Sequence, residues 1–328
     1  MDMIADFDLT AHNTFGLKST ADRAVLIDDA AMLPELAKAS AETGRPLKIL
    51  GGGSNVVLAE RLDAIVAIMR IAGRSVNQQT TDATIVTAGA GENWHDFVVW
   101  TVDQGIAGLE NLAGIPGTVG AAPIQNIGAY GAQLSDFFQS LTAYDLKTGT
   151  IETFDAEACR FAYRQSAFKS EPGRYVILTV TLALPRTWKA KRDYAGLDRL
   201  PEDATARAVL DHVVALRASK LPDWRVLGNA GSFFHNPVVS AEAARAFEDA
   251  PQYPQVDGTV KLSAGWLIEQ SGLKGFRLGP AGTYDRHALV LVNHGGATAR
   301  DIAALATHIR DKVRIRYGVD LVQEPIVL

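Results

Sequence analysis

The feature that most constrains the fold is a stretch without charged residues, 111–135, which contains five glycines and two prolines. These breakers, together with its amides and hydroxyls, exclude a membrane-spanning helix. Its centre, the glycine segment (114–131), reads GIPGTVGAAPIQNIGAYG. A long irregular segment inside a domain is usually functional or disordered, and the apolar residues here argue against disorder. We expect it to lie against a large phosphate-bearing ligand such as a dinucleotide, with Gln125 and Asn126 supplying hydrogen bonds. A packed omega-like loop is the alternative.

A second glycine cluster, the GGGSN turn (51–55), follows a short strand predicted at 46–50. Glycines allow close approach to the backbone, and successive N–H groups can bind a phosphate. The spacing is not the Rossmann G-x-G-x-x-G, no helix is predicted after the turn, and no Gly-Lys-Ser/Thr of a P-loop occurs. The cluster is therefore either a tight turn or a phosphate-binding loop of another kind.

Composition excludes several classes of protein. The 328 residues suffice for two or three domains, and 47% apolar residues suffice for buried cores. A net charge of −5 argues against a generally basic nucleic-acid binder but leaves a local cationic pocket open. The single cysteine, Cys159, forms neither an internal disulfide nor a multi-thiolate site, and the seven histidines form no HExxH or HxH cluster, so we expect no metal.

The N-terminal stretch carries acidic residues but no Lys or Arg before Lys18, so it lacks the basic region of a secretory signal. We expect a cytoplasmic protein that binds neither nucleic acid nor membrane. Nothing in the sequence specifies an oligomeric interface, and we expect a monomer.

The order of predicted elements indicates an α+β protein of three modest domains, 1–70, 71–220 and 221–317, with a last strand in 318–328 that returns toward the first domain. A helix is expected between Asp29 as N-cap and Gly44 as its end. Further helices are predicted at 93–104, 205–219, 263–271 and 298–317, the last with a capping signal at Thr298 and Asp301. Strands are predicted at 46–50, 65–69, 84–87, 141–146, 150–154, 174–184 and 287–293.

Together, the two glycine clusters resemble the FAD-binding half of the UDP-N-acetylenolpyruvoylglucosamine reductases, flavoenzymes of peptidoglycan precursor synthesis. The resemblance runs from Asn13-Thr14-Phe15 to Glu324-Pro325 and includes CRFAYRQS (159–166), GNAGSFF (228–234) and AGWLIE (264–269). It implies an FAD-binding region of the vanillyl-alcohol-oxidase type in two parts, 1–70 and 71–220, and a C-terminal α/β substrate domain, 221–317. Residues 192–197 resemble the substrate-covering tyrosine loop of one subgroup.

The resemblance implies non-covalent FAD and NADPH as co-substrate. The residues expected to bind FAD are Gly51, Gly52, Gly53, Ser54, Asn55, Gly114, Ile115, Pro116, Gly117, Gly120, Ala121, Gln125, Asn126, Gly128, Ala129 and Tyr130. Relatives continue beyond the Glu-Pro pair with a basic residue near the flavin, and no basic residue follows Pro325 here, so the resemblance leaves this one FAD contact open.

The implied reaction reduces an enolpyruvyl ether to a lactyl ether, with a hydride delivered to the terminal vinyl carbon and a proton to its neighbour. Three residues match the catalytic positions of the family. Arg164 is expected to stabilise the negative charge on the substrate carboxylate, because its planar fork suits a carboxylate. Glu324 is expected to polarise that carboxylate or relay a proton, and Ser232 to donate the proton.

The substrate implied by the resemblance is a UDP-sugar, and an acidic protein needs local positive charge to bind its diphosphate. Lys220 resembles the family's diphosphate contact, and Arg217 lies about one helical turn before it. Tyr194 and Asn236 match further substrate contacts. A last contact is expected within 284–287, at a residue that the pattern does not single out.

Each assignment has a plainer alternative. Arg164 could be a surface ion-pair residue, Ser232 a loop hydroxyl bonded to its own backbone, and Glu324 a charge that blunts a sheet edge. Two other functions also remain open. One is an oxidase of the same FAD superfamily, which often binds flavin covalently, although the only nearby histidine is His95 and no cysteine occurs there. The other is a flavin- or nucleotide-binding module without catalysis.

Overall fold

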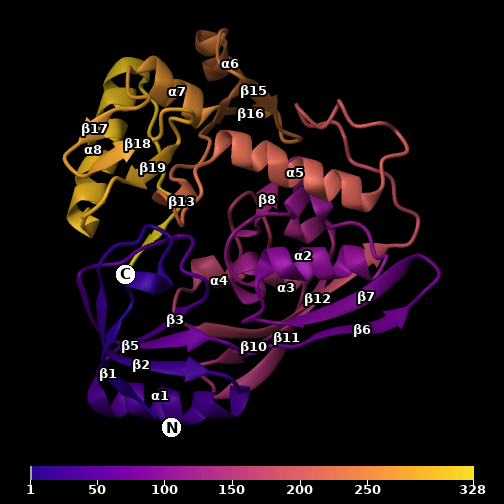
Figure 1. The fold of residues 1–328 in the computed structure, drawn as a ribbon, viewed down its shortest axis with the longest axis vertical. Coiled ribbons are helices and arrows are strands. Elements are labelled where there is room, and N and C mark those ends of the chain that lie inside the picture. The colour runs from indigo at the N-terminus through magenta and orange to yellow at the C-terminus, as the bar shows by residue number, and fades with distance from the viewer. Residues whose placement is uncertain (1) are drawn as a thin grey trace. The chain divides into compact units, whose positions relative to one another are not determined.

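The computed structural model describes residues 2–328, which form two compact units (Figure 1). The first unit comprises residues up to Phe7, Ala21–Gly52 and Asp63–Ser219. The second comprises Asp8–Thr20, Gly53–Leu62 and Lys220–Leu328. Each unit has its own apolar core, built around Trp94 and Phe97 in the first and around Phe233 and Phe234 in the second. The division into three domains stays a prediction.

The first unit begins with a four-stranded sheet in the order β1-β2-β5-β3. Its strands are β1 (Ile4–Asp8), β2 (Thr20–Ile27), β5 (Arg61–Met69) and β3 (Leu47–Leu50). The predicted helix is confirmed as the 3₁₀-helix η2 (Ala30–Met32), capped by Asp29, followed by α1 (Leu33–Thr43), which ends at a left-handed Gly44. Leu33 and Leu36 of α1 are fully buried in the core, so this face of the helix is held by apolar contact.

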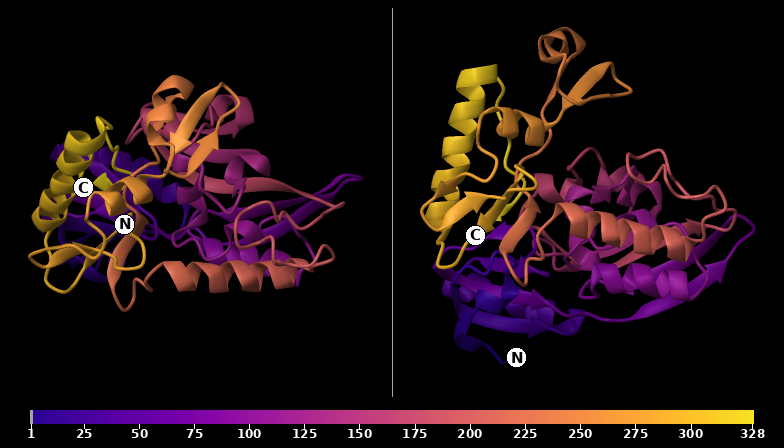
Figure 2. Two further views of the ribbon diagram at one scale, coloured as in Figure 1. Left: turned by 90° about the horizontal axis from the view of Figure 1, so that it is seen from above. Right: turned by 45° about the horizontal axis from the view of Figure 1, so that its top comes forward.

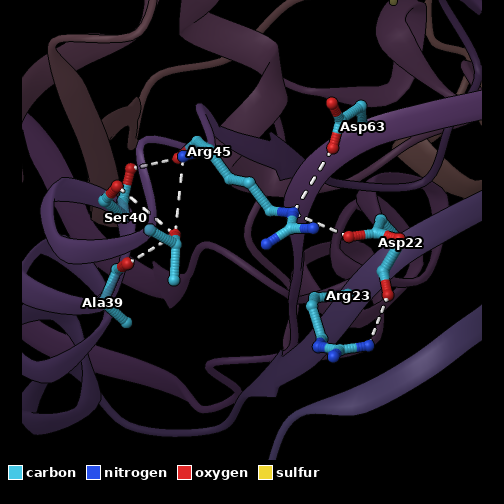
Figure 3. A network of polar contacts seen from close by, with 7 residues as sticks. Asp22, Arg23, Ala39, Ser40, Arg45 and Asp63 are labelled. Carbon is cyan, nitrogen blue, oxygen red and sulfur yellow. Dashed lines mark hydrogen bonds and ion pairs between the residues drawn. The ribbon is translucent and has the colours of Figure 1, made fainter.

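Arg45 holds the connection between α1 and β3 in place (Figure 3). Its Nε lies 2.6 Å from Asp22 Oδ2 on β2 and 3.3 Å from Asp63 Oδ1 on β5. Its carbonyl accepts a hydrogen bond of 2.6 Å from Ser40 Oγ of α1. Strand β3 leads directly into Gly51, so these contacts fix the strand from which the GGGSN turn emerges.

A five-stranded antiparallel sheet in the order β11-β10-β12-β7-β6 forms the body of the first unit. Its strands are β11 (Thr150–Asp155), β10 (Phe138–Asp145), β12 (Tyr175–Pro185), β7 (Ala83–Gly89) and β6 (Arg74–Gln79). The helices of this part are α2 (Trp94–Asp103), α3 (Ala156–Cys159), α4 (Ala167–Ser170) and α5 (Ala206–Lys220). Asp145 and Arg174 form an ion pair of 2.8 Å in which the carboxylate is completely buried.

The glycine segment is more regular than expected. The sequence predicted an irregular loop, but the segment contains the 3₁₀-helix η4 (Val119–Gln125) and the short strand β8 (Gly128–Ala129), which pairs with β9 (Ala132–Gln133) directly after the segment. The 3₁₀-helices η3 (Glu110–Leu112) and η5 (Leu134–Asp136) flank it. Proline and spaced glycines are typical of irregular loops. The 3₁₀ turns also lack the 3.6-residue periodicity by which α-helices are predicted, so the sequence gives no sign of these short elements.

The second unit is built on two sheets, of order β13-β19-β18-β17 and β14-β16-β15. The first contains β13 (Gly228–Ser232), β19 (Val290–Asn293), β18 (Ala281–Thr283) and β17 (Arg277–Leu278). The second contains β14 (Val238–Ser240), β16 (Thr259–Leu262) and β15 (Gln252–Pro254). The helices are η1 (Thr10–His12), α6 (Ala241–Ala244), η6 (Arg245–Phe247), α7 (Ala264–Gln270) and α8 (Ala299–Tyr317). Figure 2 shows α8 as the long helix beside the shorter α7.

Two further strands join distant parts of the second unit. β20 (Ile326–Val327) pairs in parallel with β4 (Val56–Val57), which directly follows the GGGSN turn. The helices predicted at 93–104, 205–219, 263–271 and 298–317 are confirmed within one residue at each end as α2, α5, α7 and α8. The strand predicted at 287–293 is too long, because the bond from Val290 N to His287 O makes a turn and β19 starts at Val290.

Throughout residues 2–328, no helix combines the length and the apolar character that crossing a bilayer demands. The same part of the chain contains no group of three or more His, Cys, Asp or Glu side chains arranged to hold a metal ion.

Candidate functional site

The two glycine clusters meet backbone to backbone within the first unit. A Cβ on Gly51 would lie 2.5 Å from Thr118 Oγ1, and one on Gly52 would lie 2.8 Å from Gly117 Cα. A Cβ on Gly120 would lie 2.4 Å from the Cβ of Ala90. Contacts this short exclude any side chain, so glycine is required for the close approach. The two sequence signals are therefore parts of one structural feature.

Thr118 places a buried hydroxyl at this meeting point. Its Oγ1 has no hydrogen-bond partner among residues 2–328. Buried polar groups are nearly always hydrogen-bonded, so an unpaired one needs an explanation. A cradle of glycine backbone with a spare hydroxyl fits a phosphate-bearing cofactor, which would accept a hydrogen bond from that hydroxyl.

The GGGSN turn continues into the second unit, where Asn13 and Thr14 hold it. Gly53 has a φ of +61°, and a Cβ there would lie 1.9 Å from the carbonyl of His12. Thr14 N donates to Gly53 O at 3.1 Å. The buried Asn13 side chain donates to the carbonyls of Leu9 and Leu17 and so fixes this loop. Ser54 and Asn55 complete the turn before β4.

Gly114, at the start of the glycine segment, is held by two side chains. Its N–H donates to His95 Nδ1 at 3.1 Å, and its carbonyl accepts from Arg217 Nε at 3.1 Å. Burial lowers the pKa of the Arg217 guanidinium, and the nearby Tyr130 hydroxyl acts in the opposite direction. Arg217, expected as a substrate contact, therefore lies against the glycine segment. Ile115, Pro116 and Gly117 follow Gly114 and lead into η4, which contains Ala121.

Arg164 packs onto the later part of the glycine segment. Its Nη2 donates to Gly128 O at 3.1 Å and its Nη1 to Asn126 O at 3.5 Å. Both Arg164 and Asn126 have positive φ, 55° and 46°, a region that non-glycine residues rarely adopt and that often marks functional positions. The Asn126 side chain compensates by bonding Ser135 N, Ser135 Oγ and Ala162 O. The predicted catalytic arginine is thus held directly on the predicted cofactor segment.

Tyr130 and Tyr194 lie against each other in the first unit. Their ring centroids are 5.2 Å apart in an edge-on arrangement. Burial raises the pKa of the Tyr130 hydroxyl, and the charge of Arg217 partly offsets this. Tyr194 is 41% exposed and lies in a segment of bends and turns between β12 and α5.

Ser232 and Glu324 are brought together in the second unit. The pairing of β13 with β19 shifts register between Asn229 and Ser232, and Gly231 in this bulge has a φ of +69°. Such a bulge redirects the side chain that follows it. Glu324 N donates to Phe233 O at 2.9 Å, which places Glu324 beside the residue that follows Ser232.

The surroundings of Glu324 include a histidine and the GGGSN turn. His235 Nε2 lies 4.0 Å from Glu324 Oε2, and both side chains are largely buried. Asn55 Nδ2 donates to Glu324 O at 3.4 Å, and Ile326 N donates to Asn55 O at 3.0 Å. The backbone of Glu324 is therefore fixed on both sides.

Lys220, Asn236 and His287 belong to the same unit. Asn236 Oδ1 accepts from Ala264 N at 2.9 Å and so fixes the start of α7. Burial lowers the pKa of His287, and the positive charges of Lys220 and Lys274 lower it further. The charge of Lys220 therefore acts on His287, which belongs to the stretch 284–287.

Known proteins match the chain over its whole length. A family model of the FAD binding domain matches residues 21–155, and one of the UDP-N-acetylenolpyruvoylglucosamine reductase C-terminal domain matches residues 222–328. Over 340 residues the chain is 51% identical to the UDP-N-acetylenolpyruvoylglucosamine reductase of Burkholderia vietnamiensis, with 100% of this chain and 97% of that protein covered. It is 50% identical to the enzyme of the same name from Burkholderia multivorans, with the same coverage. The chain belongs to the UDP-N-acetylenolpyruvoylglucosamine reductase family.

A solved structure supports the fold of this reductase. The UDP-N-acetylenolpyruvylglucosamine reductase of Thermus caldophilus superposes with a TM-score of 0.67 at 23% identity, covering 99% of this chain and 98% of that one. The expected combination of an FAD-binding region with a C-terminal substrate domain is confirmed.

Family membership also decides between the functions left open by the sequence. The reductase is an FAD-binding oxidoreductase that uses NADPH, acts on a UDP-sugar and belongs to peptidoglycan precursor synthesis. The oxidase and the module without catalysis are therefore set aside. The residues around the glycine contacts fit FAD, as the buried Thr118 hydroxyl and the excluded Cβ positions show.

Several residues that contact the predicted site residues carry little signal of their own in the sequence. Thr118 and Asn111 lie in the uncharged stretch, whose recognisable signal is its glycines and the amides Gln125 and Asn126. His235 directly follows the GNAGSFF motif, and His95 lies in the helix predicted at 93–104. His235 could have been predicted as a site residue, because it is a polar residue directly after a motif. The partners of these residues could not be predicted, because they come from distant parts of the chain.

Proposed function

We propose that this reductase converts UDP-N-acetylglucosamine enolpyruvate to UDP-N-acetylmuramate with Ser232 as the proton donor. The observation that carries this proposal is that Ser232 lies on a β-bulge and that the next residue, Phe233, accepts a backbone hydrogen bond from Glu324 N. A serine hydroxyl is a weak acid, so it needs a strongly basic carbon and close orientation to give up its proton. The bulge would fix the orientation of the Ser232 hydroxyl, and the Glu324 carboxylate is a neighbouring group able to relay a proton.

FAD, when bound, would supply the redox chemistry that moves a hydride from NADPH to the terminal vinyl carbon of the substrate. The residues proposed to hold it are those of the GGGSN turn and the glycine segment, through backbone N–H groups and the Thr118 hydroxyl. His95 and Arg217 keep Gly114 in position by bonding both of its backbone polar groups.

Arg164 is proposed to stabilise the negative charge that develops on the substrate carboxylate after hydride addition. One oriented donor at such a position contributes about 3–4 kcal/mol to the transition state. The left-handed backbone of Arg164 and its bonds to Asn126 and Gly128 support this role, because they fix the guanidinium before substrate arrives.

Substrate recognition is proposed to involve Lys220, Arg217, Asn236 and Tyr194. The two cations suit the diphosphate, and the exposed Tyr194 suits a loop that covers the sugar nucleotide. The contact between Tyr194 and Tyr130 supports placing the chain in the tyrosine-loop subgroup. We further propose a cytoplasmic, monomeric enzyme with the three-domain division predicted from the sequence.

Ser232→Ala tests the proton-donor role by separating the two half-reactions. Flavin reduction by NADPH should change less than threefold, whereas flavin reoxidation by the enolpyruvyl sugar should slow by roughly 100-fold or more, within the usual range for general acid catalysis. Anaerobic stopped-flow absorbance measures both. Ser240→Ala, at an exposed helix cap outside the site, is the matched control. Equal slowing of the two half-reactions would remove Ser232 from the role of acid.

A further inference from the structure

We propose that Asn111 is a positioning residue of this enzyme, which clamps the segment carrying Tyr194 to the glycine segment and so sets the affinity for the UDP-sugar. The inference rests on the proposed substrate role of Tyr194. Asn111 itself is only 1% exposed and acts through the backbone of its neighbours.

The clamp consists of two hydrogen bonds from one nitrogen. Asn111 Nδ2 donates to Tyr130 O at 2.8 Å and to Lys191 O at 3.0 Å. Tyr130 ends the glycine segment, and Lys191 lies three positions before Tyr194. A single buried amide therefore joins the predicted cofactor segment to the predicted substrate segment.

The orientation of the amide is determined by these partners. An amide carries two donors on nitrogen and an acceptor on oxygen, and both acceptors here are carbonyls. Reversing the amide would direct its oxygen at two carbonyl oxygens, which is repulsive. In the structure, Asn111 Oδ1 is buried and has no hydrogen-bond partner within residues 2–328. The side chain thus keeps both donors engaged while its acceptor stays unpaired.

Glu110, the adjacent residue of η3, strengthens the same connection. It is 1% exposed, and its Oε2 accepts from Gly108 N at 2.7 Å. The Trp188 side chain also donates a hydrogen bond to its carboxylate. Burial raises the pKa of Glu110, as expected for a carboxylate in an enclosed site. One 3₁₀ turn therefore anchors both Trp188 and Lys191 ahead of Tyr194.

The rest of the segment that carries Tyr194 lies largely at the surface. Residues 186–195 are mostly exposed. Trp188 and Ala190 pack partly buried against the apolar core, and Leu197 is the next fully buried residue. Further contacts of the Lys191–Tyr194 stretch include the 3.4 Å ion pairs of Lys191 with Asp136 and of Arg192 with Glu202, the bond from Arg192 to Leu200 O, the bond of 2.9 Å from Leu197 N to Tyr194 O, and the Tyr194–Tyr130 ring contact. Surface ion pairs contribute little to stability. Loss of the Asn111 clamp should therefore displace Tyr194 while the core stays folded.

The test is Asn111→Asp in the FAD-loaded enzyme, because the carboxylate has the same size but cannot donate to two carbonyls. Misplacing a positioning group by about 1 Å costs on the order of 100-fold, so KM for the enolpyruvyl UDP-sugar should rise about 10- to 100-fold. FAD content and the rate of flavin reduction by NADPH should stay within threefold of wild type. Asn77→Asp, with the same charge change on the exposed strand β6, is the control and should behave as wild type.

Asn111→Ala and Tyr194→Ala keep the proposal falsifiable if the aspartate variant folds poorly. Each should raise KM for the UDP-sugar, and the double variant should raise it no more than Tyr194→Ala alone, since the clamp acts through Tyr194. An unchanged KM in Asn111→Ala or Tyr194→Ala, additive effects, or a parallel loss of NADPH-dependent flavin reduction would each overturn the proposal. Failure of the wild-type enzyme to reduce the enolpyruvyl sugar would instead contradict the proposed function.

Discussion

Thr118 is the residue that points most directly to a bound phosphate, because its buried hydroxyl has no hydrogen-bond partner among residues 2–328. Its hydroxyl is buried beside Gly51, next to the close approach of Gly52 to Gly117, where the short distances require glycine. In a protein without a cofactor, an unpaired buried hydroxyl only destabilises the fold. Beside a phosphate it would become a donor to a charged acceptor, which is among the stronger hydrogen bonds.

Thr118→Val separates these two effects because valine has the same shape and lacks the hydroxyl. The FAD dissociation constant should rise about 10- to 100-fold, since hydrogen bonds to charged groups contribute about 1.5–3 kcal/mol. The ligand-free protein should be at least as stable as wild type, as no intramolecular bond is lost. Titration of the deflavinated protein with FAD and thermal unfolding measure the two quantities. An unchanged FAD affinity would show that the hydroxyl does not face the cofactor.

Among the elements, α8 is a helix whose capping residues and apolar spacing in the sequence match the ends and the buried face seen in the structure. Thr298 Oγ1 accepts from Asp301 N at 3.3 Å, and Asp301 Oδ2 accepts from Thr298 N at 2.8 Å, which completes a capping box. The buried residues of the helix, Ile302, Leu305, Ala306, Ile309 and Val313, recur at helical spacing. Gly318 ends it in the left-handed conformation.

Thr298→Ala should lower the free energy of unfolding by about 1 kcal/mol, the usual cost of losing an N-cap. The bonds from Thr298 lower the pKa of Asp301. A lowered pKa in the folded state adds stability above the unfolded-state pKa, and that stability disappears as the pH falls through the folded-state pKa. Alanine keeps the backbone bond to Asp301 and loses the hydroxyl bond of 2.7 Å to Asp301 Oδ2, so the destabilisation should be larger near neutral pH than in acid. Urea unfolding at several pH values measures this, and a deficit that grew in acid would contradict it.

The helices and strands predicted correctly from the sequence are those whose caps, periodicity or turn residues all lie within the element itself. Periodic helices with caps, such as α8, and the hairpin of β10 and β11 were predicted because their patterns are complete within the segment. The short strands β14 to β18 have two to four residues each and are defined by their partners rather than by their own composition. The edge strand β6 is polar and largely exposed, so no alternation marks it.

On the scale of the whole molecule, motifs identified the residues of the site but not the contacts between them. Ser232 and Glu324 were found from the sequence, yet their proximity depends on the pairing of Glu324 with Phe233, far apart in the chain. The same holds for Asn111, which contacts Lys191, and for Gly52 and Gly117. Such contacts result from the packing of elements that are distant in sequence, and a single sequence carries no direct record of them.

The central claim is that a flavin held by this chain passes electrons from NADPH to an enolpyruvyl UDP-sugar. An anaerobic visible spectrum of the purified holoenzyme tests it most directly, with NADPH added first and the sugar second. We predict that the flavin absorbance is bleached by NADPH and is restored by the sugar without oxygen. A flavin that stays reduced with the sugar and is reoxidised only by oxygen would contradict the claim.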